Sequence, residues 1–435
     1  MQNRAFRVKN YQKVAKFHRV TEKNITIRNK ADTTIKYYFI CGFLLLQGCS
    51  QAPMPQRTSW NGTLTLPETQ VALRMDLDLS GEKPSGSFIV GNEKTPIPEV
   101  TRSGDSLTFA FSEYGAEMRA RWDGHELKGE YLRHRSNGSK SFPFTASPEP
   151  VAPTNKRAPN PPTGTFQVAF NDQKEGDGLT LAKLWKDGDS YYGTFIAPDG
   201  DYGLLAGTAA TQGIQLHRFT GWQAIAIELQ PDGTGWSGKF HAASNDAPRA
   251  FSLQPHTGPE PPAPPAKQTA MKNPDAAFAF SCSSLSGETV RNTDARFKGK
   301  ALAVDIMGTW CHNCMDESPV LQELHDQYGK EGFEVVGLSF EITDDAELGR
   351  KNLDLYRDRL KLTYPLLYCG SVDDANVDKQ LRNQLQNFFA YPTTLFIDRK
   401  GKVQAIHSGF RGPGTGDQFP LQIQKLHELA SRTVQ

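Results

Sequence analysis

Two cysteines separated by two residues, Cys311 and Cys314, are the residues of this 435-residue sequence best suited to do chemistry. Such a pair can close into a disulfide and reopen, and its reactive species is the thiolate. An apolar run at 301–307 precedes the pair and a run with helical spacing at 320–328 follows it. We therefore predict a buried strand that leads into a helix, with the cysteines at the helix N-terminus. The helix dipole and unpaired N–H groups stabilise negative charge there and lower a thiol pKa. The predicted chemistry is thiol–disulfide exchange.

Other uses of a Cys-x-x-Cys pair fit the sequence less well. A tetrahedral zinc site usually needs four ligands, and neither a second Cys-x-x-Cys pair nor a suitably spaced His pair completes one, so we expect no metal. Covalent haem attachment requires a His directly after the second Cys, where Met315 stands. A purely structural disulfide remains an alternative, although Trp310 before the pair and the strand–helix context favour a redox role.

From Phe278 to the C-terminus the sequence resembles the TlpA/ResA-like thioredoxin family. Separate segments carry the resemblance: an opening hairpin at 278–290, a strand with the active site at 300–314, the Cys-x-x-Cys-x-x-Glu-x-Pro pattern that ends at Pro319, a Tyr-Pro-Thr-Thr strand at 391–398, and a glycine-rich loop at 409–414. The resemblance implies a thioredoxin-like α/β domain over residues 275–435. It also implies a thiol–disulfide oxidoreductase that needs no cofactor beyond a redox-active disulfide between its two cysteines.

The resemblance also assigns roles to individual residues. Cys311, the more exposed cysteine, would attack a substrate disulfide, and Cys314, one helical turn deeper, would resolve the mixed disulfide. Pro392 would follow a cis peptide bond. Cis X–Pro bonds are uncommon in folded proteins, so a persistent one usually has a structural purpose. Together with Tyr391 it would form an edge on which a substrate chain docks. An ordinary strand-leading proline is the alternative for Pro392.

Two acidic residues are expected to tune the cysteines. Asp305 interrupts an apolar run, which is unusual in a buried strand. It aligns with the acidic residue beneath the active site of thioredoxins, and a buried carboxylate with a raised pKa can take a proton from Cys314. Glu317 lies three residues after Cys314, on nearly the same helix face, where the resemblance implies that it adjusts the cysteine pKa values. The alternatives are a solvent-facing Asp305 and a solvated first-turn Glu317.

The residues around the pair bear on the direction of the reaction. Strong oxidants of this fold place His directly before the second Cys, whereas here His312 follows the first Cys and Asn313 fills the other position. We therefore favour a reductase. A thiol peroxidase of the redoxin type is an alternative, but Gly308 occupies the position three residues before Cys311 where peroxidases commonly have Thr.

Further strands and helices must hold this site in place. The pattern predicts strands at 333–340 and 364–368 and helices at 345–360 and 419–430, in an α/β sandwich with a mixed sheet. Cys282 and Cys369 fall on predicted strands, and we expect them to be small buried residues without a bridge.

The middle of the chain predicts two all-β modules, at 57–147 and 163–255. Alternating apolar residues and Asp-Gly turns recur, and no helical pattern stands out. Glycine and aromatic positions repeat at offsets of 107 and then 109 residues, which indicates two related barrels or sandwiches. Chance similarity between Gly-rich β sequences is the alternative. Proline-rich linkers at 148–162 and 256–274 would separate the domains. The modules carry no catalytic pattern, and spacing, dimerisation and substrate recruitment all remain open for them.

The N-terminus predicts export. Residues 1–36 hold ten Lys or Arg and two acids, and the apolar stretch 37–46 that follows is too short to span a bilayer of about 30 Å. This pattern predicts a signal peptide over residues 1–48. Leu46 to Cys49 resembles a bacterial lipobox, so Cys49 is the expected lipidation site. A plain signal peptide or an uncleaved anchor is the alternative.

These features predict a multidomain protein of the cell envelope, on the periplasmic side and anchored to a membrane by lipid, or periplasmic if it is not lipidated. Its expected partners are disulfide-containing envelope proteins, in line with a role in cytochrome c maturation, and a membrane thiol donor. A net charge of +1 gives no reason to expect nucleic acid as a partner. A non-catalytic envelope binding protein is the remaining alternative.

Overall fold

A computed structural model of the chain describes residues 52–135, 138–148, 162–174, 176, 178–210, 212–258 and 268–435. The predicted signal peptide, Cys49 and most of both proline-rich linkers lie outside the described residues. None of the helices in the described part of the chain combines the length and the apolar character needed to cross a bilayer.

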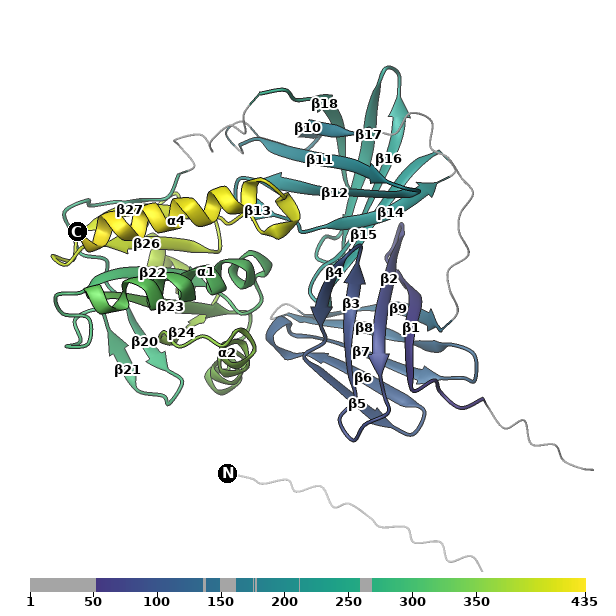
Figure 1. The fold of residues 1–435 in the computed structure, drawn as a ribbon, viewed down its shortest axis with the longest axis horizontal. Coiled ribbons are helices and arrows are strands. Elements are labelled where there is room, and N and C mark those ends of the chain that lie inside the picture. Colours follow the sequence, from purple (N-terminus) through teal and green to yellow (C-terminus); the bar gives the residue numbers. More distant parts are fainter. Residues whose placement is uncertain are drawn as a thin grey trace, which may run out of the picture. The chain divides into compact units, whose positions relative to one another are not determined.

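The first half of the β region is a nine-stranded antiparallel sheet in the order β4-β3-β2-β1-β9-β8-β7-β6-β5 (Figure 1). Its strands alternate inward apolar and outward polar side chains, as in β2, where Val71, Leu73 and Met75 are buried between exposed neighbours. The strands are β1 Arg57–Thr65, β2 Gln70–Asp78, β3 Ser85–Val90, β4 Glu93–Pro96, β5 Glu99–Ser103, β6 Ser106–Phe111, β7 Ala116–Trp122, β8 Leu127–Arg135 and β9 Gly138–Ser147. One 3₁₀ turn, η1 (Ser112–Tyr114), joins β6 to β7.

The second half is another nine-stranded sheet, which the pairing of β11 with β12 closes into a barrel-like form. Its strands are β10 Gly164–Phe170, β11 Thr180–Asp187, β12 Ser190–Ala197, β13 Gly200–Asp201, β14 Leu205–Ala210, β15 Gly213–Phe219, β16 Ala224–Asp232, β17 Gly235–Ala242 and β18 Arg249–Pro255. In both sheets the first strand pairs with the second and with the ninth. Residues 57–255 therefore form a large all-β region, which we call the β region.

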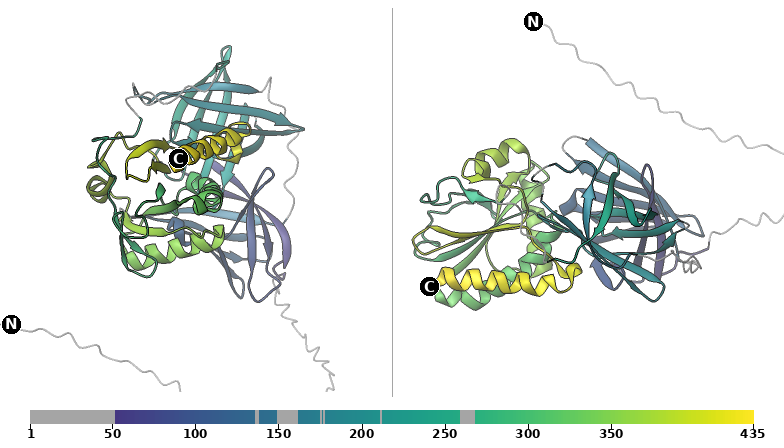
Figure 2. Two further views of the ribbon diagram at one scale, coloured as in Figure 1. Left: turned by 60° about the vertical axis from the view of Figure 1, so that its left-hand side comes forward. Right: turned by 90° about the horizontal axis from the view of Figure 1, so that it is seen from above.

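The C-terminal part is an α/β domain with a seven-stranded mixed sheet in the order β21-β20-β24-β23-β22-β26-β27 (Figures 1 and 2). Its strands are β20 Ser281–Ser284, β21 Thr289–Arg291, β22 Ala301–Met307, β23 Phe333–Glu341, β24 Leu366–Ser371, β26 Thr393–Ile397 and β27 Val403–Ser408. Its helices are α1 His312–Tyr328, α2 Ala346–Leu360, α3 Asp374–Val377 and α4 Gln418–Val434. The remaining short elements are β19 Ala270–Met271, β25 Leu385–Gln386, η3 Gly329–Glu331, η4 Asp378–Arg382 and η5 Pro413–Thr415. This is the thioredoxin-like architecture that the resemblance implies. The two strands and two helices predicted after α1 are in place as β23, β24, α2 and α4.

The central strand β22 is buried along its whole length, and its alternate side chains serve two cores. Ala301, Ala303 and Met307 pack with apolar residues of α1, α2 and α4 on one face of the sheet. Leu302 and Val304 pack with the N-terminal hairpin and the η4 segment on the other. The odd-numbered positions of β22 therefore face α1, and Asp305 is one of them.

Cys282 and Cys369 form a disulfide, so our expectation that they are unbridged was wrong. They are 87 residues apart in sequence. Ser283 pairs with Tyr368 in the adjacent antiparallel strands β20 and β24. Cys282 precedes Ser283 and Cys369 follows Tyr368, so the two cysteines face each other with their Cα atoms 4.7 Å apart. That separation lies within the range that disulfides span. Strand pairing therefore makes the bridge, and sequence spacing alone does not reveal it.

Removal of this bridge by the double substitution Cys282→Ser and Cys369→Ser should destabilise the α/β domain. A cross-link over a loop of this length restricts the unfolded chain, so we expect the free energy of unfolding to fall by about 2–4 kcal/mol. Urea unfolding of the oxidised proteins, followed by near-ultraviolet circular dichroism, measures the change. The two proteins should become equally stable after full reduction, and a difference that persists there would contradict this explanation.

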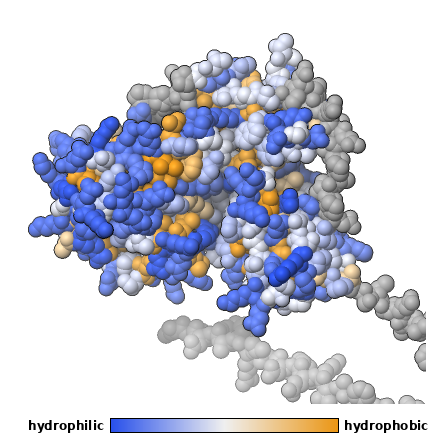
Figure 3. All heavy atoms as spheres, in the orientation of Figure 1, coloured by the Kyte–Doolittle hydropathy of each residue, from blue (hydrophilic) through white to orange (hydrophobic). Residues whose placement is uncertain are grey.

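Polar side chains cover most of the face shown in Figure 3, and apolar residues reach it only in small patches. The large apolar side chains that are more than a third exposed among the described residues are Trp185, Leu348, Leu355 and Leu421. Other large aromatic residues, including those near the cysteine pair, are at least partly covered.

Candidate active site

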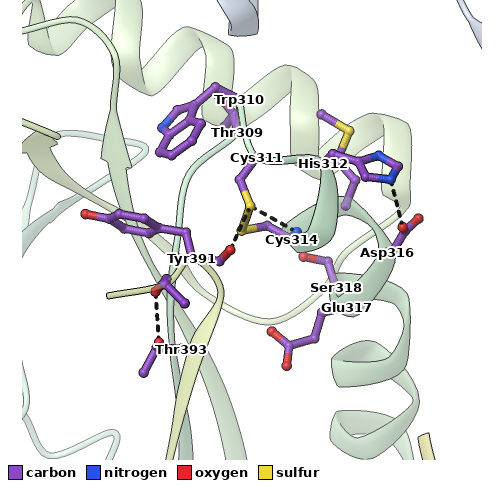
Figure 4. Close-up of a disulfide and its surroundings, with 12 residues drawn as sticks. Thr309, Trp310, Cys311, His312, Cys314, Asp316, Glu317, Ser318, Tyr391 and Thr393 are labelled. Carbon is purple, nitrogen blue, oxygen red and sulfur yellow. Dashed lines mark hydrogen bonds and ion pairs between the residues drawn. A yellow bond between two sulfur atoms is a disulfide. The ribbon is translucent and has the colours of Figure 1, made fainter. Parts of the chain in front are cut away.

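The cysteine pair stands where β22 gives way to α1 (Figure 4). Cys311 is the N-cap of α1, with extended backbone angles, and its Sγ accepts a hydrogen bond of 3.2 Å from the backbone N–H of Cys314. A helix N-terminus leaves such N–H groups without partners in the helix, and they favour a negative charge on the acceptor. The fold therefore places Cys311 where a thiolate is stabilised. In this structure the two cysteines form a disulfide.

Both sulfur-bearing residues are buried, Cys311 with 5% of its surface exposed and Cys314 with none. The order of exposure agrees with the expected order of action. The peptide bond between Tyr391 and Pro392 is cis, as the resemblance implies. The carbonyl oxygen of Tyr391 lies 3.4 Å from Sγ of Cys311 (Figure 4), so a reduced thiol there can donate a hydrogen bond to it. Tyr391 and Pro392 thus border the reactive sulfur.

Asp305 and Glu317 are both fully buried beneath the pair, so neither is the solvent-facing acid of the alternative interpretation. Thr394 connects them: it pairs with Asp305 across β22 and β26, and its hydroxyl lies 3.3 Å from both carboxylate oxygens of Glu317. Burial raises the pKa of Asp305 to about 8. Burial and the neighbouring Asp305 raise the pKa of Glu317 well above its usual value. At neutral pH most of both acids are therefore protonated, and only the ionised fraction can accept a proton from a cysteine thiol.

A third buried acid, Glu341 at the end of β23, fixes the segment before Cys311. Its carboxylate accepts hydrogen bonds from the backbone N–H of Thr309 at 3.1 Å and from the Thr309 hydroxyl at 2.7 Å, and it also accepts one from Ser339. The indole N–H of Trp310 donates to the carbonyl of Phe340 at 2.8 Å. Sequence reasoning missed Glu341, although an acid inside the apolar run of a strand is the same signal that identified Asp305.

His312 and Asp316 face each other on α1, with Nε2 and Oδ2 3.4 Å apart (Figure 4). Burial lowers the pKa of His312 to about 3. Burial, with help from the nearby carboxylate of Asp201, raises the pKa of Asp316 to about 8. Both groups are therefore neutral at pH 7, and the contact is not an ion pair. The position directly after Cys311 thus adds no positive charge that would favour the thiolate.

The structure brings together the sequence-predicted residues of the α/β domain. Figure 4 shows Trp310, Cys311 and His312 at the start of α1, with Tyr391 opposite them. Asn313 completes the turn between the cysteines. Of the predicted site residues, Cys49 is the one that lies outside the described residues. Such an arrangement can form a disulfide with a substrate sulfur at Cys311 and break it again with Cys314.

The C-terminal part of the chain is similar in sequence to known proteins. A model of the AhpC/TSA family matches residues 274–406. The thioredoxin-like protein YneN of Bacillus subtilis is 33% identical over 143 residues, which cover 33% of this chain and 75% of that protein. The thiol-disulfide oxidoreductase ResA of Geobacillus thermodenitrificans is 31% identical over 146 residues, which cover 33% of this chain and 73% of that protein. Among solved structures, a thiol-disulfide oxidoreductase from Bacteroides fragilis is 20% identical, with a TM-score of 0.26 and coverage of 34% of this chain and 99% of that one.

Proposed function

Because the chain belongs, through its C-terminal domain, to the ResA-like family of thiol-disulfide oxidoreductases, we propose that it reduces protein disulfides with the Cys311–Cys314 dithiol. The observation that carries the proposal is the position of Cys311. This residue caps α1, receives the N–H of Cys314, and lies beside the carbonyl of Tyr391. An attacking sulfur needs both kinds of contact. The N–H of Cys314 at the start of α1 stabilises its negative charge, and the carbonyl of Tyr391 borders the space that a substrate chain would use.

In the proposed reaction the thiolate of Cys311 attacks one sulfur of the substrate disulfide. A mixed disulfide forms, the substrate S–S bond breaks, and the other substrate sulfur leaves as a thiolate that takes up a proton. Cys314 then loses its proton to the ionised form of Asp305 or Glu317, which is the minor form at neutral pH because both pKa values are raised, and attacks Cys311. The second substrate sulfur leaves, so two electrons have passed to the substrate and the enzyme disulfide has formed. A dithiol donor restores the reduced enzyme by the reverse exchange.

The reducing direction can be tested by equilibrating the full chain in glutathione buffers of graded ratio and quantifying the oxidised pair. The neutral His312 adds no positive charge beside Cys311 that would stabilise the reduced state. We therefore expect a potential nearer the roughly −270 mV of thioredoxin than the roughly −120 mV of the strongest oxidants of the fold. A value at the oxidising end would contradict the reductase role.

The proposal places this enzyme outside the cytoplasm, held to a membrane through lipid on Cys49. The basic segment 1–36, the short apolar stretch and the lipobox-like sequence support it. Its substrates would be exported proteins with disulfides, in line with cytochrome c maturation, and a membrane thiol donor would supply the electrons. We also propose that the β region arose by duplication. The repeated glycine and aromatic positions support this, as does the common pairing of the first strand with the second and ninth.

Peroxide reduction is the second candidate, because the matching family model is that of AhpC/TSA. Gly308 offers no hydroxyl three residues before Cys311, and the hydroxyl of Thr309 is bound to Glu341. We therefore rank this activity below disulfide reduction, and peroxide consumption by the reduced full chain is the measurement that separates the two.

A further inference from the structure

Residues of the β region cover the face of the α/β domain that surrounds Cys311. This active-site face consists of Trp310, Asn313, Met315 and the loop 409–414. Trp310 and Met315 pack against the core of the first sheet. The ring of Trp310 lies 5.8 Å from that of Trp222, and the hydroxyl of Tyr114 lies 3.0 Å from Sδ of Met315. An aromatic wall from the β region therefore stands beside the nucleophile.

A turn of the second sheet lies along the loop 409–414 as an added strand would. Gly200 forms a parallel β-bridge with Phe410. The carboxylate of the next residue, Asp201, accepts the backbone N–H of Gly412 at 2.6 Å. A Cβ atom built on Gly200 would collide with the side chain of Asn313, between the two cysteines. Strand addition is a common way for a protein to bind an extended peptide, so this turn occupies a place suited to a peptide.

A partly buried ion pair holds the two parts together next to these contacts. Glu113 on η1, with 3% of its side chain exposed, pairs with Arg359 near the end of α2. The amide of Asn352, also on α2, donates to the carbonyl of Ser112 at 3.3 Å. Because a buried charge that loses its partner is strongly destabilised, this pair holds η1 on α2 as long as both residues are present.

We propose that the β region closes the active site, so that a disulfide in a folded protein reaches Cys311 only when the β region moves away. The exposed fraction of 5% at Cys311 and the occupied loop 409–414 carry the proposal together. A small disulfide needs far less room than a protein and should react with far less dependence on opening. The proposal rests on the proposed function, because it concerns access to the same sulfur.

The test uses the full chain with two substrates, insulin and bis(2-hydroxyethyl) disulfide, and dithiothreitol as the reductant. Arg359→Ala removes the cation that pairs with the buried Glu113. The matched control is Arg357→Ala, on the same helix, whose guanidinium is more exposed and, among the described residues, pairs with two acids of α2 itself. With a bulky substrate the rate scales with the fraction of open molecules. We expect Arg359→Ala to raise the rate with insulin by about tenfold, within the range typical of coupled equilibria. The rate with the small disulfide should change less than twofold, and the control should match the wild type with both substrates.

A second matched pair tests the other side of the contact and guards against misfolding. Glu113→Gln should act like Arg359→Ala, whereas Glu117→Gln, whose carboxylate pairs with Arg119 within the same sheet, should not. The double variant Glu113→Gln with Arg359→Ala should reduce insulin little faster than either single variant, because both substitutions remove the same interaction. Equal ratios of the two rates in all proteins would overturn the closing role while leaving the oxidoreductase function intact. A wild type that reduces neither substrate would instead contradict the proposed function.

Discussion

Replacement of Cys311 with serine should abolish insulin reduction, with a loss of at least about a thousandfold, because the covalent step then lacks its nucleophile. Cys314→Ser should behave differently. Its Cys311 can still attack, but no second sulfur expels the captured substrate, so a mixed disulfide should accumulate. Mass spectrometry after rapid alkylation with iodoacetamide identifies that adduct and the cysteine that carries it.

The structural bridge supplies the control for this experiment. The Cys282→Ser and Cys369→Ser double variant lacks two cysteines but keeps the active pair, so it should reduce insulin at nearly the wild-type rate. Two results would contradict the assigned order: an adduct on Cys314 in the Cys311→Ser protein, or wild-type turnover in either active-site variant.

The stability of the α/β domain should fall as the pH rises from about 4 to about 8, and Asp305→Asn should remove much of that dependence. The pKa of Asp305 is raised from 3.8 to about 8 by burial, so the folded protein holds a proton that the unfolded chain releases in this interval. The folded state thus binds more protons than the unfolded state, and the free energy of unfolding decreases with rising pH. A tenfold change in proton affinity is worth about 1.4 kcal/mol, so the variant should be more stable than the wild type by several kcal/mol at pH 8.

Urea unfolding of the oxidised proteins at pH 5 and pH 8 gives this difference directly. Asp326→Asn, an exposed acid on the same helix as Glu317, is the control and should follow the wild type at both values. The same Asp305→Asn protein should reduce insulin about a hundredfold more slowly if Asp305 takes the proton of Cys314. A parallel loss of stability with pH in the variant and the wild type would show that another group holds the proton.

The linear sequence revealed those parts of the site that lie close together along the chain or carry a specific pattern. The apolar run before Cys311 and the helical spacing after Cys314 led to β22 and α1, and the resemblance of the Tyr-Pro-Thr-Thr segment to the thioredoxin family led to the cis peptide at Pro392. The acid within an apolar run at Asp305 was found for the same reason. Each of these features depends on neighbours within a few residues, and local patterns report such neighbours well.

The missed features depend on contacts between distant segments. The bridge between Cys282 and Cys369 follows from the pairing of β20 with β24. The residues of these two strands contain no pattern that predicts their pairing. The contact of Trp222 with Trp310 joins two parts of the chain that periodicity treats as independent domains. Aromatic residues such as Trp222 satisfy the pattern of a β core as well as that of an interface, so composition does not distinguish the two uses.

The bridge between β20 and β24 has a consequence for how the protein is made. Under the proposed function this chain donates electrons, yet formation of the bridge between Cys282 and Cys369 takes two electrons from its own thiols, and an oxidising catalyst has to accept them. The newly made enzyme would thus be a substrate of disulfide-forming catalysts, although the proposed function of its mature form is to reduce disulfides. Cells that lack such a catalyst would accumulate a form without this bridge, which is less stable to unfolding although its reactive pair is chemically intact.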